Sequence, residues 1–419
     1  MKNIKLYLLL FSFLISFSKN QAQIVKILFD ASKAEASGNA DWVIDADQYN
    51  LGFFNGPAVL WQGDESNAQR IPTPLQSEVD SSTMQNFWTG GLSAWAIDCV
   101  KRNYEVETLP YNGQITYGSL SNPQDLSYYN IFIVCEPNIN FISSEKNAII
   151  NFVLNGGSLF MISDHDMSDR NGDNWDSPHI WNDLMNNNSV QNNLFGMTFD
   201  YFSFSQTSTN IHVMANDSIL NGPMGAVSKV QWSSGTSITL NPANNSTVQG
   251  SIYKNGSAFG NTNVMCAYAY YGNGKVAAIG DSSPSDDGTG DQNDQLYDGY
   301  IQDAAGNHQK LLMNITIWLA NSGLTNGISN LVSEKNELTI FPNPSKNNST
   351  INFSLNSDAP VSINLFDLEG RLVMPVINEI KKAGTYQESI NVSDLKAGIY
   401  VCKYSSKNNF QNYKITIIQ

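Results

Sequence analysis

IFIVCEPNINFISSEKNAIINFVLNGGSLFMISD, residues 131–164, decides the fold of the larger part of this chain. The stretch begins with a short apolar run, continues through a polar segment with helically spaced apolar residues, stops at two glycines and resumes with a second apolar run. Two short apolar strands joined by one helix are typical of the βαβ unit of a parallel sheet, whose strands are buried on both faces. We expect Ser143 or Ser144 to cap the helix, and Gly156 and Gly157 to end it.

The alternation of strand and helix continues on both sides of this stretch. Upstream, residues 25–30 and 103–110 read as strands, and residues 86–103 read as a helix. Downstream, a helix begins at Pro178, residues 274–281 form another strand, and residues 307–321 form a last amphipathic helix. Residues 200–272 are expected to form antiparallel hairpins inserted on this core. The sequence therefore predicts an α/β domain over residues 23–322, with a mostly parallel sheet, flanking helices and a β-hairpin insertion.

The N-terminus has the features of a secretory signal peptide. Lys2 and Lys5 give a positively charged start, residues 6–17 form a short apolar run, and Ala22 offers a small residue for cleavage. The run is too short to span a bilayer comfortably, and no later segment approaches the length of a transmembrane helix. We therefore predict a signal peptide over residues 1–22 and a mature chain that begins near Gln23.

Charge and cysteine usage exclude several classes of protein. The 419 residues carry 38 acidic against 23 basic side chains, a formal net charge of −15. This balance argues against nucleic-acid binding, which requires clustered Lys and Arg, and suits a secreted protein able to bind hard cations. The four cysteines form no C-x-x-C pair, which indicates neither a disulfide framework nor a thiolate zinc site; they are Cys99, Cys135, Cys266 and Cys402. We expect them to act as small buried hydrophobic residues.

The last part of the chain changes to an all-β pattern. A connector rich in Gly, Asn and Ser occupies residues 323–336, and short strands separated by turns follow over residues 337–419. This composition predicts a small β-sandwich. Three motifs mark it: FPNP at 341–344, LFD followed by GR at 365–371, and LKAGIY at 395–400.

These motifs, in this order and at the end of the chain, resemble the type A C-terminal sorting domain of type IX secretion cargo from Bacteroidetes. The resemblance covers the whole all-β section. It implies that the type IX secretion machinery is a partner, and that the protein passes through the periplasm and the outer membrane to the cell surface or the medium. It implies nothing about what the cargo does.

Acidic residues recur where the predicted strands of the large domain end. Asp30, Glu136, Asp164 and Asp281 each follow an apolar run. Since the carboxyl ends of parallel strands lie along one edge, we expect these four acids to gather at a ligand crevice. For any one of them, the alternative is that it caps the turn or helix that follows.

Two acidic loops extend this edge. The first, after residue 162, contains Asp164, Asp166, Asp169 and Asp173, and the second contains Asp281 and Asp287. Several oxygen ligands on flexible, Gly-containing loops suit a hard divalent cation, with calcium the first candidate. Neither loop has the calcium-loop pattern of the EF-hand, and solvated Asx-turns are the alternative.

His165 lies between two acids directly after a strand. It is a candidate general base held by a carboxylate, or a metal ligand, and His179 could approach the same loop. We therefore predict a catalytic group of Asp164, His165 and Asp30. An isolated histidine is more often structural, and that alternative stays open. Several tryptophans could stack on sugar rings if they are exposed; they are Trp42, Trp61, Trp88 and Trp175.

The unit over residues 131–164, together with YGNGKVAAIGDSS at 271–283, resembles the class I glutamine amidotransferase-like superfold, and is closest to its branches without amidotransferase activity. In that fold, the strand after the GG turn leads to a cysteine nucleophile. The corresponding position here falls at residues 163–165, where no cysteine occurs. A Cys-His-Glu amidotransferase is therefore disfavoured, and the G-x-S-x-G motif of α/β-hydrolases is also absent from the sequence.

The leading hypothesis from the sequence is a secreted hydrolase directed at a polysaccharide or an ester, with a carboxylate-rich site around a divalent cation. The cation would polarise the substrate or activate water, with His165 or a nearby carboxylate as base. The alternative is a secreted protein without catalytic activity that binds a glycan or a protein partner and uses calcium structurally.

Overall fold

A computed structural model describes residues 24–37, 40–45, 68–214, 217–289, 299–301, 304, 306–321, 338–355, 358–367, 372–406 and 409–418. The predicted signal peptide and the predicted connector over residues 323–336 lie outside the described residues. The chain divides into two compact units, residues 1–325 and residues 326–419, which are described separately.

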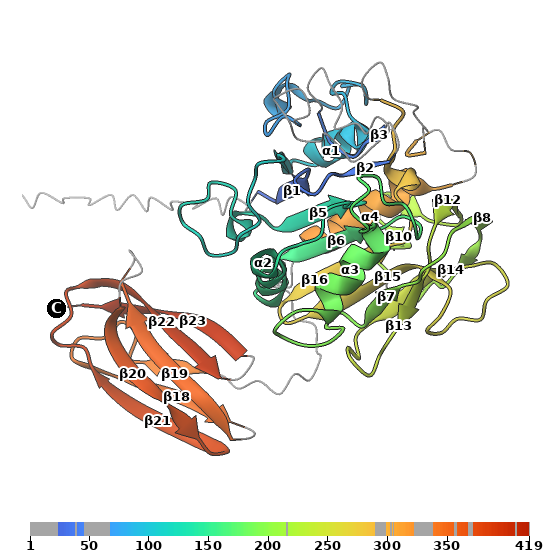
Figure 1. Cartoon of the computed structure of the whole chain (residues 1–419). Coiled ribbons are helices and arrows are strands. Elements are labelled where there is room, and N and C mark those ends of the chain that lie inside the picture. Colours follow the sequence, from blue (N-terminus) through green and yellow to red (C-terminus); the bar gives the residue numbers. More distant parts are fainter. Residues whose placement is uncertain are drawn as a thin grey trace, which may run out of the picture. The chain divides into compact units, whose positions relative to one another are not determined.

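The larger unit is built on a ten-stranded sheet, half of which is parallel. The strands β1, β4, β5, β6 and β16 run parallel in the order β4-β1-β5-β6-β16 (Figure 1). Their bounds are β1 Lys26–Asp30, β4 Glu105–Leu109, β5 Ile131–Cys135, β6 Ser158–Ile162 and β16 Gly274–Ile279. β5 and β6 are buried along their whole length, as strands covered on both faces must be.

The other half of the sheet is antiparallel, and it corrects the prediction of a mostly parallel sheet. β15 (Val264–Tyr271) pairs antiparallel with β16, and β13 (Ile238–Leu240) and β7 (Met197–Phe199) continue outward. The reason is the two-residue turn between β15 and β16, where Gly272 adopts a positive φ of 57°. Such a short connection can join only antiparallel strands. Much of the predicted hairpin insertion therefore extends the central sheet.

Shorter strands complete this half. β14 (Gln249–Tyr253) pairs with both β15 and β9 (Asn210–Ile211). Three two-stranded ribbons lie outside the main sheet: β8 (Phe204–Ser208) with β12 (Val230–Gly235), β10 (Asn221–Gly222) with β11 (Gly225–Ala226), and β2 (Ala36–Ser37) with β3 (Ala40–Asp41). The described part of the larger unit is thus a mixed α/β fold, and the finer amidotransferase-like assignment remains a prediction.

Among the described residues of the larger unit, four α-helices cover the sheet, two on each face. α1 (Ser93–Val100) and α4 (His308–Ala320) pack in one hydrophobic cluster, and α2 (Ser143–Leu154) and α3 (Ser177–Asn186) pack in the other. α1 is shorter than the predicted helix over residues 86–103. α2 begins one residue after its cap, Ile142, whose N–H donates to Glu145 at 2.9 Å; the predicted serine caps lie inside the helix. At its end, Gly157 permits contact with Phe152, whose ring a Cβ would meet at 2.1 Å.

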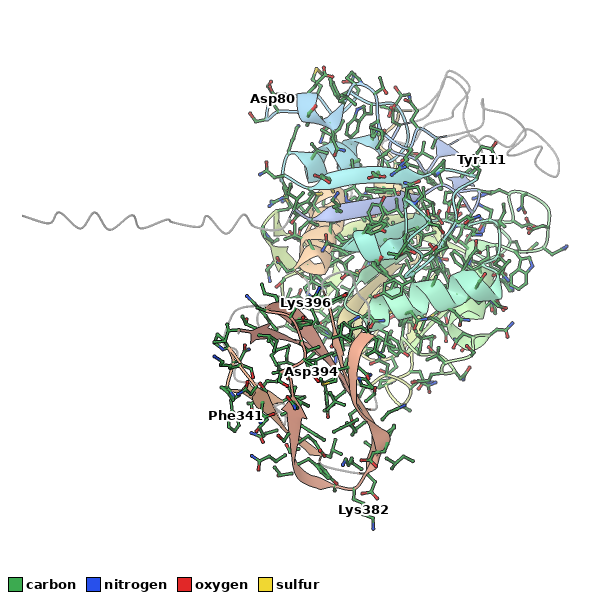
Figure 2. All side chains as sticks on the ribbon, turned by 90° about the vertical axis from the view of Figure 1, so that its left-hand side faces the viewer. Asp80, Tyr111, Phe341, Lys382, Asp394 and Lys396 are labelled. Carbon is green, nitrogen blue, oxygen red and sulfur yellow. The ribbon has the colours of Figure 1, made fainter. Side chains whose placement is uncertain are left out.

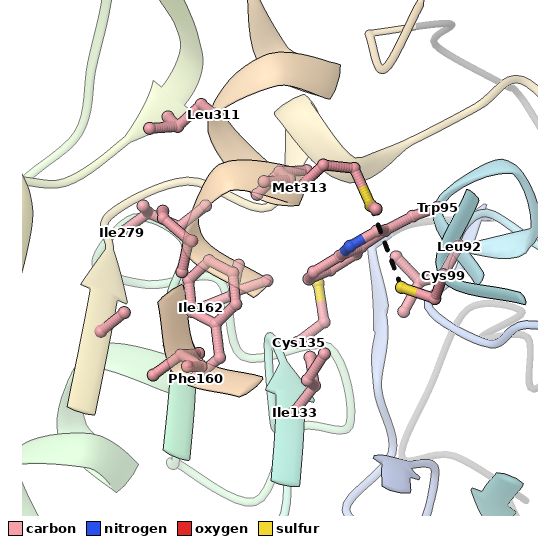
Figure 3. Close-up of a cluster of buried hydrophobic side chains, with 14 of the residues drawn as sticks. Leu92, Trp95, Cys99, Ile133, Cys135, Phe160, Ile162, Ile279, Leu311 and Met313 are labelled. Atoms are coloured by element: carbon pink, nitrogen blue, oxygen red, sulfur yellow. Dashed lines mark hydrogen bonds between the residues drawn. The ribbon is translucent and has the colours of Figure 1, made fainter. Parts of the chain in front are cut away.

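The cluster beneath α1 and α4 is organised around Trp95 (Figure 3). The Trp95 ring contacts Phe29 and Phe160 edge-on, with centroids 5.5 and 5.6 Å away. Its Nε1 donates to Thr316 Oγ1 at 3.1 Å, which satisfies the one polar atom of the indole. Trp95 therefore joins α1, β1, β6 and α4 in a single core.

Replacing Trp95 with Ala is expected to lower the free energy of unfolding of the larger unit by about 3–5 kcal/mol, because the substitution leaves a large cavity in a buried cluster. Urea denaturation of the mature chain, followed by near-UV circular dichroism, measures the change. Leu120→Ala is the matched control: Leu120 is 91% exposed, so its substitution should change the free energy by less than about 0.5 kcal/mol. Equal effects of the two substitutions would contradict this role of Trp95.

The smaller unit is all-β, with one sheet of three strands and one of four. The first has the order β17-β18-β21 and the second β20-β19-β22-β23. Their bounds are β17 Thr339–Phe341, β18 Asn348–Leu355, β19 Ala359–Phe366, β20 Leu372–Lys381, β21 Gly384–Asn391, β22 Gly398–Ser406 and β23 Asn409–Ile417. A single cluster of buried residues from both sheets forms its core, as expected of a sandwich.

The FPNP motif anchors the start of this unit to its last strand. Asn343 donates from Nδ2 to the Lys414 carbonyl at 2.7 Å and accepts from the Thr416 N–H at 2.9 Å. Figure 2 shows Phe341 at this motif and Lys382 in the turn between β20 and β21. The Asn343 side chain thus bonds to the backbone of β23 as a neighbouring strand would, and it links the start of this unit to its last strand. Cys402 lies in its core, and all four cysteines of the chain are buried and unpaired.

Candidate functional site

The four predicted strand-end acids follow neighbouring parallel strands. Asp30 ends β1, Glu136 follows β5, Asp164 lies two residues after β6, and Asp281 lies two residues after β16. The register aligns the last residues of β5, β6 and β16, because Cys135 and Ile279 both pair with Ile162. These four residues are called the carboxylate edge below. All four are buried, with at most 3% of their surface exposed.

Arg170 links two members of the carboxylate edge. Its Nε and Nη2 donate to Glu136 Oε1, both at 3.1 Å, and Nη2 also donates to Asp164 Oδ2 at 2.8 Å. One guanidinium therefore holds two buried carboxylates together. Sequence reasoning gave Arg170 no role, although it is the only Arg or Lys in the acidic loop over residues 163–176.

Glu136 also accepts hydrogen bonds at its second carboxylate oxygen. Its Oε2 accepts from Trp42 Nε1 at 2.8 Å and from Ser282 Oγ at 2.6 Å. The residue adopts a positive φ of 49°, and Ala34 (60°) and Met167 (64°) do the same in two other segments near this edge. Left-handed backbone is costly for residues with a Cβ and gathers at functional sites.

His165 lies on the loop after β6 and is partly exposed, with 23% of its side-chain surface accessible. Its Nδ1 is 2.6 Å from the Asp166 carbonyl oxygen, which can only accept, so Nδ1 carries a proton. In the neutral ring, Nε2 then has the lone pair. Nε2 lies 3.8 Å from Asp164 Oδ2, a distance that a water or a substrate hydroxyl could bridge.

Burial shifts the acids of this edge toward their protonated forms. Burial, together with the charges of Glu136 and Asp281, raises the pKa of Asp164 well above its usual range, although Arg170 opposes this. Burial also raises the pKa of Asp281 to about 8, against the N–H groups of Ser283 and Ser233 that favour the carboxylate. Clusters of acids with raised pKa values are typical of functional sites, although structural networks also produce them.

Asp30, the third predicted catalytic residue, points into the domain. Its Oδ1 accepts from the N–H and the hydroxyl of Ser32 at 3.0 and 2.7 Å. Only 1% of the residue is exposed. Burial raises the pKa of Asp30, and burial together with the charge of Asp30 raises the pKa of Glu35 well above its usual range.

The predicted metal ligands do not come together as one set. Asp169 accepts from the N–H groups of Gly172 and Asn174, and Asp173 accepts from that of Trp175, so both stabilise turns of their own loop. Asp281 likewise accepts from backbone amides. Asp287 accepts from Ser93 Oγ and from the Ala94 N–H, both at 2.6 Å, and so caps the start of α1.

Within the described part of the chain, one group of three potential metal ligands has its ligand atoms within 4.8 Å of one another. It consists of Asp166, Asp176 and His179, and is called the Asp166 group below. His179 Nδ1 lies 2.6 Å from Asp176 Oδ1 and 3.9 Å from Asp166 Oδ1. The His179 ring stacks on Tyr201 with centroids 4.1 Å apart, which orients the ring. Asp176 also caps α3, so the group sits at the start of that helix.

The tryptophans offer little surface for sugar stacking. Trp42 and Trp88 are buried, Trp175 is partly buried, and Trp61 lies outside the described residues. The exposed aromatic ring closest to the Asp166 group is that of Tyr201, half of whose surface is accessible. Sequence reasoning missed Tyr201, because its position follows only from the packing of the loop after β7.

Comparison with known proteins identifies the smaller unit. A family model described as a secretion system C-terminal sorting domain matches residues 339–419. No curated protein matches the chain. No described helix is long and apolar enough to cross a membrane.

Two solved structures are similar to the chain at 13% identity. The mmIFT52 N-terminal domain matches over 72% of this chain and 99% of its own, with a TM-score of 0.38. Gan42B, a GH42 beta-galactosidase, matches over 69% of this chain and 34% of its own, with a TM-score of 0.26, so the chain spans about a third of that enzyme. The sorting-domain match confirms the resemblance seen in the sequence: residues 339–419 form a type IX secretion sorting domain, and the protein that carries it is exported to the cell surface or the medium.

Proposed function

We propose that the larger unit is an exported hydrolase whose reacting groups lie on the loop after β6. The observation that carries the proposal is the state of His165, whose Nδ1–H is fixed by the Asp166 carbonyl so that Nε2 is the basic nitrogen. A general base requires such a lone pair at a partly exposed position. The neighbouring Asp164, with its raised pKa, would supply a proton, and Arg170 would keep that carboxyl in place.

The Asp166 group would hold the divalent cation of this hydrolase. Three protein ligands with open positions are typical of catalytic metal sites. An imidazole ligand favours zinc or another transition metal over calcium, which prefers oxygen ligands throughout. The positive end of α3 opposes a cation by about 1 kcal/mol, which is small against typical metal-binding energies. A cation bound there would polarise a substrate carbonyl or lower the pKa of a bound water.

The substrate class is a polysaccharide or an ester, as the sequence suggested. In this site the chain's own residues would act as follows: His165 takes a proton from the attacking hydroxyl or water, and Asp164 returns one to the leaving group. A panel of chromogenic esters and glycosides, applied to the mature chain with and without zinc, is the direct test. Absence of turnover across the panel in the presence of zinc would overturn the proposal.

His179→Ala is expected to abolish the rise in melting temperature that zinc gives to the mature chain, because the substitution removes the only nitrogen ligand of the Asp166 group. Differential scanning fluorimetry with zinc, calcium and EDTA measures the effect. A protein stabilised by a ligand at 100 times its dissociation constant gains about 2.7 kcal/mol. His212→Ala is the matched control, since His212 packs on Phe259 away from this group and should leave the zinc response intact. An unchanged zinc response in His179→Ala would rule out this site.

A second candidate function is glycan binding without catalysis. It is favoured by the internal bonding of the carboxylate edge, whose acids are buried and accept hydrogen bonds from the chain itself. The half-exposed Tyr201 ring would then be the stacking surface for a sugar. Binding on a glycan array, lost in Tyr201→Ala and unaffected in His165→Asn, would favour this function over hydrolysis.

A further inference from the structure

A pocket of about 550 Å³ lies near the start of β4, at the opposite end of the parallel strands from the carboxylate edge. Its lining comes from the end of α1, the turn that leads into β4, and the turn between β10 and β11. The lining residues are Asp98, Lys101, Arg102, Asn103, Tyr104 and Met224. Small-molecule sites in proteins have volumes of roughly 300–1,000 Å³, so the pocket is large enough for a small ligand.

The walls of this pocket are held in place by the fold. On one side, Asn103 adopts a positive φ of 62° and turns the chain out of α1, and the Tyr104 N–H donates to the Cys99 carbonyl at 3.2 Å. On the other side, the Met224 N–H donates to Oδ1 of Asn314, a fully buried residue of α4, at 2.9 Å. The pocket is therefore formed before any ligand arrives, which lowers the entropic cost of binding.

Arg102, in this lining, has no carboxylate partner among the described residues. Its one side-chain hydrogen bond runs from Nη2 to Met224 Sδ at 3.0 Å, and a thioether is a weak acceptor for a group with five N–H donors. The other two described arginines, Arg70 and Arg170, both form ion pairs with carboxylates. The chain has 38 acidic against 23 basic side chains, so a partly buried guanidinium without an acid is unexpected. Most of its donors are therefore available to a ligand.

The other charged groups of the lining leave the pocket positive. Lys101 Nζ donates to a neutral group, the Thr83 carbonyl, at 2.7 Å. Asp98 is the one acid of the lining, and its Oδ2 accepts from Tyr300 Oη at 3.0 Å and from Gln309 Nε2 at 2.7 Å. Two cations thus face one carboxylate that already has donors of its own. The local charge is opposite in sign to the net charge of the chain, which favours an anionic ligand at this place.

The alternative role for these cations is to stabilise the end of α1, because positive side chains interact favourably with the C-terminus of a helix. The hydrogen bonds at this helix end are made by the backbone. The Lys101 N–H donates to the Ile97 carbonyl at 2.9 Å, and the Arg102 N–H donates to the Cys99 carbonyl at 3.0 Å. The Arg102 side chain donates to Met224 and not to a carbonyl of α1, so the helix ends without its help.

We propose that this pocket binds a small organic oxyanion, a carboxylate or a phosphate, through the guanidinium of Arg102. The planar fork of an arginine matches the two oxygens of either group and binds them with two parallel hydrogen bonds. Lys101 supplies the second positive charge, and the Tyr104 ring and the Met224 side chain contact the apolar part of the ligand. The pocket is separate from the loop that carries His165, so its ligand is distinct from the substrate proposed above.

Isothermal titration calorimetry of the mature chain tests the proposal, with inorganic phosphate and galacturonate as separate probes. At least one of them should bind with one site per chain, and the probe that binds more tightly identifies the oxyanion. Arg102→Gln should weaken this binding about tenfold or more, because a charge-assisted pair of hydrogen bonds is lost. Arg102→Lys keeps the charge but loses the fork, so it should weaken binding less, and it provides a second variant if the first fails to fold.

Lys254→Gln is the matched control, because it removes the same charge from a side chain outside the pocket, whose Nζ lies 4.1 Å from the Phe204 ring centroid. It should leave the affinity within about twofold. Absence of binding by both probes, or equal affinities of Arg102→Gln and Lys254→Gln, would overturn the proposal. A lower melting temperature in Arg102→Gln with unchanged affinity would assign Arg102 to the end of α1 alone. The outcome is independent of the hydrolase proposal, since binding is measured without turnover and no variant alters His165 or the Asp166 group.

Discussion

The free energy of unfolding of the larger unit should decrease as the pH rises from 5 to 8, by on the order of 1 kcal/mol per pH unit for Asp281 alone. In the unfolded chain Asp281 ionises near its ordinary pKa of 3.8, whereas in the folded protein burial raises that pKa to about 8. Between these values the folded state binds one more proton than the unfolded state. Stability from this group is therefore complete below pH 4 and is lost as the pH passes through 8. Urea denaturation at several pH values measures the slope.

Asp281→Asn should flatten this slope, although it should also lower stability at acid pH by roughly 1 kcal/mol, because the amide cannot accept from both Ser233 and Ser283. Asp125→Asn is the matched control. Hydrogen bonds from Ser127 and Thr116 lower the pKa of Asp125 to about 2 despite partial burial, so its contribution is constant between pH 5 and 8. The control should lose stability equally across this range and keep the slope. A free energy of unfolding that does not change between pH 5 and pH 8 in the natural protein would contradict the raised pKa of Asp281.

The parallel half of the fold could be predicted because its signals are local. β5, β6 and the intervening α2 each follow from short-range patterns: uniformly apolar runs, helical spacing and the glycines at 156 and 157. The antiparallel half could not be predicted to the same degree. Whether β13 or β7 joins the central sheet depends on the register that the tight turn at Gly272 imposes on β15, and on contacts between residues far apart in sequence.

The sorting domain could be predicted best, because its motifs lie close together in the sequence and in a fixed order. Asn343 of the FPNP motif bonds to β23, some 70 residues later, so the motif has a structural role in the sandwich. In the larger unit, the sequence placed acids at one edge of the sheet and drew attention to His165. It could not show that Arg170 bridges two of the acids, or that Asp176 and His179 approach Asp166, because both depend on how one loop folds back on itself.

The predicted calcium ligands show that the composition of a loop cannot by itself identify a metal site. Asp169, Asp173 and Asp287 are acidic residues in Gly-containing loops, and each accepts hydrogen bonds from backbone amides nearby. Such bonds and metal coordination use the same carboxylate oxygens, so the sequence pattern cannot separate the two. The binding of a divalent cation by the larger unit therefore remains a proposal. The zinc response of the Asp166 group tests it most directly.

His165→Asn is expected to reduce kcat/KM of the mature chain, on whichever ester or glycoside it hydrolyses, by about 10²- to 10⁴-fold. Asn can keep the hydrogen bond to the Asp166 carbonyl but has no basic nitrogen at the position of Nε2. The loss should fall mainly on kcat, since proton transfer occurs in the transition state and not in substrate binding. Steady-state kinetics measures the effect, and the melting temperature and its response to zinc should stay near those of the natural protein.

The matched control for this loss is His212→Asn, because His212 is a partly buried histidine that contacts the Gly250 carbonyl and Phe259. Its substitution should leave kcat within about twofold, as expected of a residue that takes no part in the reaction. A cavity variant gives the sharper test: in His165→Gly, added imidazole should restore part of the lost turnover by replacing the missing base. If His165→Asn and His212→Asn turn over substrate equally, or if imidazole restores nothing while His165→Gly remains folded, the general base of this site is not His165.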